Sequence, residues 1–271
     1  MPTISSSVAA NTAASILARN NEEQAKSIAR ISSGQRIIQP SDDAAGLAVG
    51  TGLLADVAVF KQASTNITGT NAILNVADAG VSAVGDILER QQVLATQAQS
   101  AGLDADARNA LNTEYQALSA EIDAIQGSTN FNGQNLTDGS FNTDVAVGAG
   151  GEVIAADLSN VDVSTANLGT AGTDLLNPAN AAAAFAAVDS AIGDVSGFRA
   201  EIGATQSRFN FRDNVVKQQE VNTQAAASAI LDVDVAAEST RLTNSRVLSE
   251  SAIAGLSQAN ALTQSLLNIV R

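Results

Sequence analysis

The sequence predicts a mainly α-helical fold, with long antiparallel coiled-coil helices, paired N- and C-terminal helices and a small β-hairpin insert. Apolar residues recur over long stretches at alternating spacings of three and four, which is the seam period of a coiled coil. Aromatic residues make up only 3% of the 271 residues, so small aliphatic side chains must form a core of closely packed helices. Glycine, asparagine and threonine concentrate between residues 128 and 176, which favours a hairpin there.

The first helix is expected over residues 4–31, and Gly34 and Pro40 break the chain after it. Its apolar side chains form a loose stripe that includes Ile16, Leu17, Ile28 and Ile31.

Ser41 is a suitable N-cap for the second helix and would place Asp42 and Asp43 in its first turn, where the helix dipole favours carboxylates. We assign capping to these two carboxylates, because no complementary acid, base or nucleophile accompanies them for catalysis.

The second helix should extend to about residue 100. From Phe60 to Ala98 twelve positions follow a strict three–four alternation, and ten of them are apolar. This period predicts a left-handed supercoil. A shorter helix, capped by Asp104 and ended by Gly127, should pack against it as an antiparallel pair.

The insert between residues 128 and 176 should contain a hairpin that turns at Gly148–Gly151, and a further strand is conceivable near Val161 and Val163. The glycines favour a turn over a phosphate loop, because no Gly-Lys-Ser/Thr follows them.

Asn177 and Pro178 predict the start of a third long helix that ends near residue 230. Arg199 and Gln206 interrupt its apolar stripe and are interpreted as subunit contacts. Asp232–Asp234 should mark a break before the last helix.

The last helix carries no charge from Ser251 to Val270. Polar side chains interrupt the run too often for a membrane span, which needs about 20 mostly apolar residues. The helix therefore needs protein on nearly every side, and the two chain ends most simply pair with each other. We expect one domain from residues 1–41 plus 232–271, and an outer coiled-coil domain from residues 42–231. The stripe of the last helix comprises Leu248, Ala252, Gly255, Ala259, Leu262, Leu266 and Ile269.

The net charge of −14 argues against nucleic acid and anionic membranes as partners. Residues 1–41 carry four basic against two acidic side chains, and residues 232–271 carry three against four, so the middle of the chain holds nearly all of the net charge. Near-neutral ends can pack together in a dry core.

The chain has neither cysteine nor histidine, which removes disulfides, the commonest general base and the commonest zinc ligand. We expect no catalytic residue, cofactor or metal site. Asp232, Asp234 and Glu238 are interpreted as a solvated helix boundary, since only Asp234 and Glu238 share a helix face. The N-terminus lacks the basic segment of a Sec-type signal peptide, so the chain is expected to stay in the cytoplasm or to leave by another route.

Three motifs resemble those of bacterial flagellins. Arg30–Ile37 followed by Asp42–Gly46 is similar to the family's "RLSSG-x-RI…DDAAG" signature, and Gln126–Gly133 resembles its "GQTQFNG" turn. Leu256–Asn260 and the ending Leu266–Arg271 resemble its "LAQANQ…LLR" C-terminus. The motifs occur in the family's order and span nearly the whole chain.

The resemblance implies a subunit of the flagellar filament, exported through the central channel by the flagellar type III apparatus. Its paired ends would form the inner tube of the filament and its long helices the outer tube. Implied partners are copies of itself, other flagellins, a cytoplasmic export chaperone that holds the C-terminal segment, and the hook-associated and cap proteins. About forty residues separate the NFNG turn from Asn177, so we expect a short, core-only form.

We expect the two ends to fold only when neighbouring copies bury them, because one terminal helix alone does not bury enough apolar surface to offset the entropy of ordering it. The predicted self-assembly core comprises Ile16, Leu17, Ile28, Ile31, Leu248, Ala252, Leu256, Ala259, Leu262, Leu266 and Ile269.

The resemblance also implies a candidate contact for an innate-immune Toll-like receptor at Arg90, Leu94 and Glu114. Residues 89–97 depart from the family's "QRVRELAVQ" by the loss of an Arg and a Glu and by a new charge at Glu89. The alternative is that Arg90 and Glu114 are surface ions on adjacent helices.

Three other functions compete with a filament subunit. A hook–filament junction protein shares the terminal motifs and is the main alternative. A signalling coiled coil would need a membrane anchor or an adaptor site, and the sequence shows neither. An inserted metallopeptidase would need a His-Glu-x-x-His zinc site, which a chain without histidine cannot form.

Overall fold

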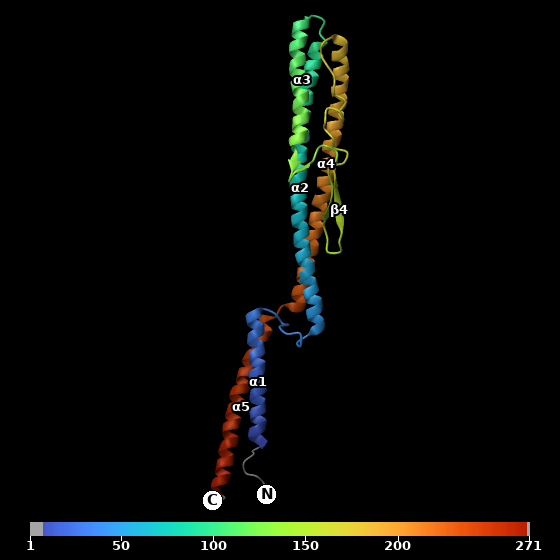
Figure 1. The fold of residues 1–271 in the computed structure, drawn as a ribbon. Helices are drawn as coiled ribbons and strands as arrows, with labels where there is room; N and C mark the ends of the chain where they lie inside the picture. Colours follow the sequence, from blue (N-terminus) through green and yellow to red (C-terminus); the bar gives the residue numbers. More distant parts are fainter. Residues whose placement is uncertain (1–7, 270–271) are drawn as a thin grey trace. The chain divides into compact units, whose positions relative to one another are not determined.

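The computed structural model describes residues 8–269, except for the side chains of Ala9 and of residues 262–269. Figure 1 shows a mainly helical chain, as predicted. The helices are α1 (Val8–Ser33), α2 (Ala44–Ala98), α3 (Ala105–Ser128), α4 (Pro178–Leu231) and α5 (Val235–Ile269), and the strands are β1 (Asn130–Phe131), β2 (Gln134–Asn135), β3 (Asn142–Ala146) and β4 (Val153–Asp157).

The chain divides into two compact units. The first unit combines residues 1–57 with residues 222–271, and the second comprises residues 58–221. The divisions fall inside α2 and α4, whereas the predicted domain boundaries fall at the breaks before and after these helices. The assignment of residues 1–41 plus 232–271 and of 42–231 to separate filament domains remains a prediction.

The core of the second unit is the seam that the three–four pattern predicts. Of the twelve positions from Phe60 to Ala98, all but the half-buried Phe60 are buried. They pack with Tyr115 and Ile122 of α3 and with apolar side chains of α4. Parts of α2 and α4 are also long and apolar enough to cross a membrane by length and composition alone, a property that core helices share.

The helix starts of the second unit follow their capping residues. Asp104 accepts a hydrogen bond from the Ala107 amide at 2.8 Å, which confirms the predicted start of α3. Asn177 likewise accepts from the Asn180 amide at 2.8 Å at the start of α4.

The predicted hairpin is confirmed: β3 and β4 pair antiparallel, from Asn142 opposite Asp157 to Ala146 opposite Val153. Arg212 of α4 forms an ion pair with Glu152 beside the hairpin turn. The strand suggested near Val161 and Val163 is wrong. The segment forms only an isolated antiparallel bridge, between Asp162 and Asp138, and the two valines are buried in the core.

The interpretation of Arg199 and Gln206 as subunit contacts remains a prediction, and within the chain both side chains contact α2. The Arg199 Nε atom lies 3.0 Å from Asp78 Oδ1, and Gln206 Nε2 donates to Asn75 Oδ1 at 3.0 Å. Both polar side chains of α4 therefore find partners on α2.

Two helical glycines of α2 predict opposite effects of substitution by alanine. A Cβ at Gly80 would lie 2.7 Å from Thr129 Cγ2, whereas a Cβ at Gly69 would meet no atom within 4 Å. We expect Gly69→Ala to raise the unfolding free energy of the monomer by about 0.5–1 kcal/mol. Gly80→Ala should lower it by about 1–3 kcal/mol, because the buried Thr129 must move. Urea unfolding followed by circular dichroism measures both, and equal stabilisation by the two variants would contradict the packing described.

Candidate functional site

The two ends of the chain form an antiparallel helix pair in the first unit. α1 and α5 lie side by side in Figure 1 and contact each other along their lengths. Asn21 lies against Ser249, Gln24 against Ser245, and Ser27 against Glu238, so the helices run in opposite directions. The predicted pairing of the terminal helices is confirmed.

The fully buried positions of the seam between α1 and α5 are polar, and half-buried aliphatic side chains share their three–four spacing. The Gln24 Nε2 atom donates to the Ser245 carbonyl oxygen at 3.0 Å and to Ser249 Oγ at 2.7 Å, while Ser27 Oγ donates to Glu238 Oε1 at 2.6 Å. Small or polar side chains therefore hold the pair together. Those that are buried on the two helices are Asn20, Ser27, Glu238, Ser245 and Ser249.

Large apolar side chains of the pair point away from the seam. Ile16 is 38% exposed, Ile28 52% and Leu248 54%. The other described residues of the predicted self-assembly core, Leu17, Ile31, Ala252, Leu256 and Ala259, are half-buried. Leu262, Leu266 and Ile269 lie outside the described side chains. The exposed members of this set are apolar surface that the described chain leaves uncovered, whereas the half-buried members are covered in part.

The prediction that Glu238 lies at a solvated helix boundary is wrong, because Glu238 is only 2% exposed. Asp234 does cap α5, through bonds from the amides of Ala236 and Ala237 at 2.9 and 3.0 Å. One turn later, Glu238 faces α1, where Ser27 and Arg30 meet it. The sequence pattern did not show which face of α5 contacts α1.

The connector between α1 and α2 is tied to the break between α4 and α5. Gly34 adopts a φ of +73°, which only glycine adopts readily, and its carbonyl oxygen accepts from the Val233 amide at 3.0 Å. The Arg36 amide donates to the Leu231 carbonyl oxygen at 2.6 Å. The RISSGQRI motif thus builds a backbone joint within the first unit.

The predicted capping arrangement at α2 needs one correction. The helix begins at Ala44, and its cap is Asp43, whose Oδ1 accepts from the Gly46 amide at 2.8 Å. Ser41 bonds only the side chain of Gln39, at 3.5 Å. An additional turn of the chain precedes α2, so the cap lies two residues later than predicted, at Asp43 instead of Ser41.

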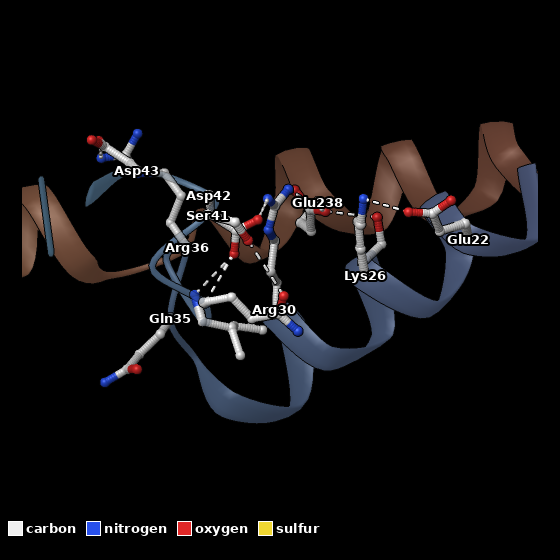
Figure 2. A network of polar contacts seen from close by, with 12 residues as sticks. Glu22, Lys26, Arg30, Gln35, Arg36, Ser41, Asp42, Asp43 and Glu238 are labelled. Carbon is white, nitrogen blue, oxygen red and sulfur yellow. Dashed lines mark hydrogen bonds and ion pairs between the residues drawn. The ribbon is translucent and has the colours of Figure 1, made fainter. Parts of the chain in front are cut away.

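Asp42 closes the connector instead of occupying the first helical turn. Its Oδ2 atom accepts from the amides of Ile38 and Gln39 at 3.2 and 3.1 Å, and its Oδ1 lies 3.5 Å from Arg30 Nη2, as Figure 2 shows. The two backbone donors, and after them the positive charge of Arg30, hold the pKa of Asp42 below its ordinary value.

The three candidate receptor residues do not share one surface. The Arg90 Nη2 atom lies 2.6 Å from Glu114 Oε1, and this ion pair joins α2 to α3 on an exposed face. Leu94 is 1% exposed and belongs to the core. The structure thus brings Arg90 and Glu114 together and leaves Leu94 beneath the surface.

Family models match both parts of the chain. The model of the bacterial flagellin N-terminal helical region matches residues 4–142, and that of the C-terminal helical region matches residues 185–270. The chain belongs to the bacterial flagellin family. It is a structural subunit that self-assembles into the flagellar filament outside the cell, the organelle of swimming.

Several curated flagellins are similar in sequence to this chain over nearly their full length. The chain is 35% identical to the flagellin of Halalkalibacterium halodurans over 254 residues, which covers 93% of each chain. It is 32% identical to that of Listeria monocytogenes over 272 residues, or 94% of each, and 30% identical to that of Bacillus subtilis over 302 residues, or 99% of each. These relatives are therefore similar to this chain in length.

Two solved structures are similar. The crystal structure of Bacillus cereus flagellin has a TM-score of 0.50 and 30% identity, and the match covers 60% of this chain and 94% of that one. A Vibrio parahaemolyticus protein described as flagellar hook-associated has a TM-score of 0.59 with 15% identity, covering 70% of this chain and 100% of that one. The second likeness shows the fold alone, so the hook–filament junction alternative has less support than the flagellin assignment.

The lowered pKa of Asp42 predicts how the connector responds to acid. A carboxyl group whose folded-state pKa is lowered adds stability above its ordinary value of 3.8, and this stability is lost as the pH falls through the lower folded-state value. We expect the amide proton shifts of Ile38 and Gln39 to titrate together with a midpoint below pH 3.8. NMR titration measures this. Asp42→Asn should abolish the titration and Asp43→Asn should preserve it, whereas a midpoint at or above 3.8 would contradict the bonding described.

Proposed function

We propose that the outward apolar stripe of α1 and α5 is the surface through which copies of this chain bury one another in the filament. The observation that carries the proposal is that the helix pair buries polar side chains in its seam and leaves the apolar side chains of Ile28 and Leu248 exposed outside it. The surface comprises the exposed predicted core residues Ile16, Ile28 and Leu248, and the half-buried Leu17, Ile31, Ala252, Leu256 and Ala259, which the helix pair already covers in part. Leu262, Leu266 and Ile269 complete the predicted set, and their side chains are not described.

Charge supports the same surface. The terminal segments are nearly neutral, while the middle of the chain carries almost all of the net charge of −14. Neutral helices can approach one another without the repulsion that acidic segments would meet. The exposed apolar side chains of the helix pair therefore lie on segments of low net charge, which favours an interface between identical copies.

The isolated helix pair should be weakly protected. The fully buried positions of the seam are polar and its aliphatic side chains are only half-buried, so the pair gains little to offset the entropy of ordering about 60 residues. We expect slow amide exchange in α3 and fast exchange from residue 245 onward in a verified monomer. Strong protection of residues 245–269 in the monomer would contradict folding upon assembly.

Substitution of the exposed stripe tests the interface. We expect Ile28→Ser and Leu248→Ser each to raise the critical concentration of seeded filament growth by about tenfold or more, since each removes roughly 1.5–3 kcal/mol of apolar burial between copies. The fold of the monomer should persist, because both side chains are exposed in it. Sedimentation and electron microscopy measure filament growth.

A matched control replaces an exposed aliphatic side chain by serine at a position outside the helix pair. Val153 at the start of β4 is exposed to a similar degree, so Val153→Ser makes the same polar replacement outside the helix pair. Growth of Val153→Ser at the wild-type critical concentration, with failure of the other two, would localise the effect to the stripe. Unimpaired growth of Ile28→Ser and Leu248→Ser would refute the proposed interface.

The proposed partners in the cell follow from the same surface. A cytoplasmic export chaperone would cover the apolar C-terminal segment before export, and other flagellins, hook-associated proteins and cap proteins would contact it after export. Val247, Leu248 and Ile253 are exposed apolar side chains of α5 that such partners could bury. The proposal includes no catalytic role, since the chain belongs to a family of structural proteins and has neither histidine nor cysteine.

Recognition by a Toll-like receptor is proposed at the Arg90–Glu114 pair alone. Because Leu94 is buried, an exposed polar pair must supply the contact, so we expect weak signalling that Arg90→Ala lowers further. A reporter-cell assay with intact monomer measures the response, and Arg19→Ala in α1 serves as the matched control. No response to the wild-type monomer, or equal responses to both variants, would contradict recognition at this pair.

A further inference from the structure

Glu238 carries a buried carboxylate that is paired with side chains from both α1 and α5. Its Oε1 atom accepts from Ser27 Oγ at 2.6 Å and lies 3.8 Å from Arg30 Nη1 on α1. Its Oε2 atom lies 3.1 Å from Arg241 Nη1 on α5. A carboxylate taken out of water is strongly destabilising unless such partners surround it. The arrangement of α1 against α5 must therefore keep Ser27 and Arg30 beside Glu238.

Away from the backbone joint at the connector, the other polar contacts of the seam do not select one arrangement. Ser245 and Ser249 lie one helical turn apart and present similar hydroxyl groups, and Gln24 already bonds one atom from each. If α5 slid by one turn, about 5.4 Å, one serine would replace the other opposite Gln24. The exposed side chains Ile28 and Leu248 lie outside this contact and do not oppose such a slip.

Glu238 does oppose a slip in either direction. After a slip, the Glu238 carboxylate would no longer lie opposite Ser27. It would lie opposite a residue four positions from Ser27 on the same face of α1, which is Glu23 in one direction and Ile31 in the other. Opposite Glu23, two carboxylates would repel each other. Opposite Ile31, the buried charge would lose its hydrogen bond. Both slipped registers are penalised, and one polar residue in a helix seam is a known means of fixing register.

The same charge is linked to the connector. Arg30 lies between Glu238 and Asp42, and Asp42 accepts the amides of Ile38 and Gln39. Figure 2 shows this row of side chains, which joins α5, α1 and the connector. The position of α5 along α1 is thus coupled to the connector's conformation within the first unit.

We propose that Glu238 is a positioning residue for filament assembly, which fixes the register of α5 against α1. The inference rests on the proposed function, because the outward stripe contains residues of both helices, such as Ile28 and Leu248. A slip of one turn would separate the two halves of that stripe by about 5.4 Å, and neighbouring copies could no longer bury both.

The absence of native cysteines allows the register to be measured directly. Asn21→Cys with Ser249→Cys reports the observed register, because Ser249 Oγ lies 3.4 Å from Asn21 Oδ1. Asn21→Cys with Ser245→Cys, or with Ile253→Cys, reports a slip of one turn in either direction. Each pair is oxidised in the monomer and after growth on wild-type seeds, and intramolecular disulfides are quantified by mass spectrometry.

We expect the native pair to dominate when Glu238 is present. In Glu238→Leu the ratio of slipped to native disulfide should rise about tenfold or more, and without the reporters the critical concentration of seeded growth should rise by a similar factor. Glu238→Gln, which keeps the shape and the bond from Ser27, should restore part of both. Glu250→Leu, an exposed glutamate of the same helix, should change neither.

The outcomes separate this inference from the proposed function. An unchanged disulfide ratio in Glu238→Leu, or a changed ratio with normal growth, would overturn the positioning role. Dominance of a slipped pair in the wild type would also overturn it. If Glu238→Leu shifts the register while Ile28→Ser and Leu248→Ser grow normally, the register effect stands and the proposed interface fails.

Discussion

The constraint on which the structure depends is the polar seam between α1 and α5. Gln24, Ser27 and Glu238 fill the space between the two terminal helices, so the chain's own pairing uses hydrogen bonds and one buried charge. Such contacts contribute little net stability, because the separated helices would bond to water instead. They are directional, however, and they leave the apolar side chains of both helices free for other molecules.

In the second unit, by contrast, the regularly spaced apolar side chains form the core. Its three–four stripe is buried inside the chain, from Ala63 to Ala98, and packs against α3 and α4. This unit therefore has a continuous apolar core of its own, although side chains such as Phe211 remain exposed on it. A filament subunit thus combines a part that is complete as a monomer with a part that is completed by assembly. Only the second kind of part ties folding to polymer growth.

Most of the fold could be predicted, because the long helices carry strong periodicity and their starts carry explicit caps such as Asp104 and Asn177. The site was less predictable. Glu238 follows a helix cap and has a charged side chain, so local pattern favours exposure, and only the contact with a helix more than 200 residues away buries it. Likewise, Asp42 bonds backward to the connector instead of forward to α2. The alternation of Val161 and Val163 suggested a strand, but the segment pairs through a single antiparallel bridge, because the length of the pairing is set by tertiary contacts.

The most direct measurement of this account is a side-chain-resolution structure of the assembled filament by electron cryomicroscopy. The account predicts that Ile28 and Leu248 lie buried against neighbouring copies, while the Ser27–Glu238 bond remains within one chain. If Ile28 and Leu248 face solvent in the filament, or if Glu238 bonds a neighbouring copy instead of Ser27 of its own chain, the account is contradicted.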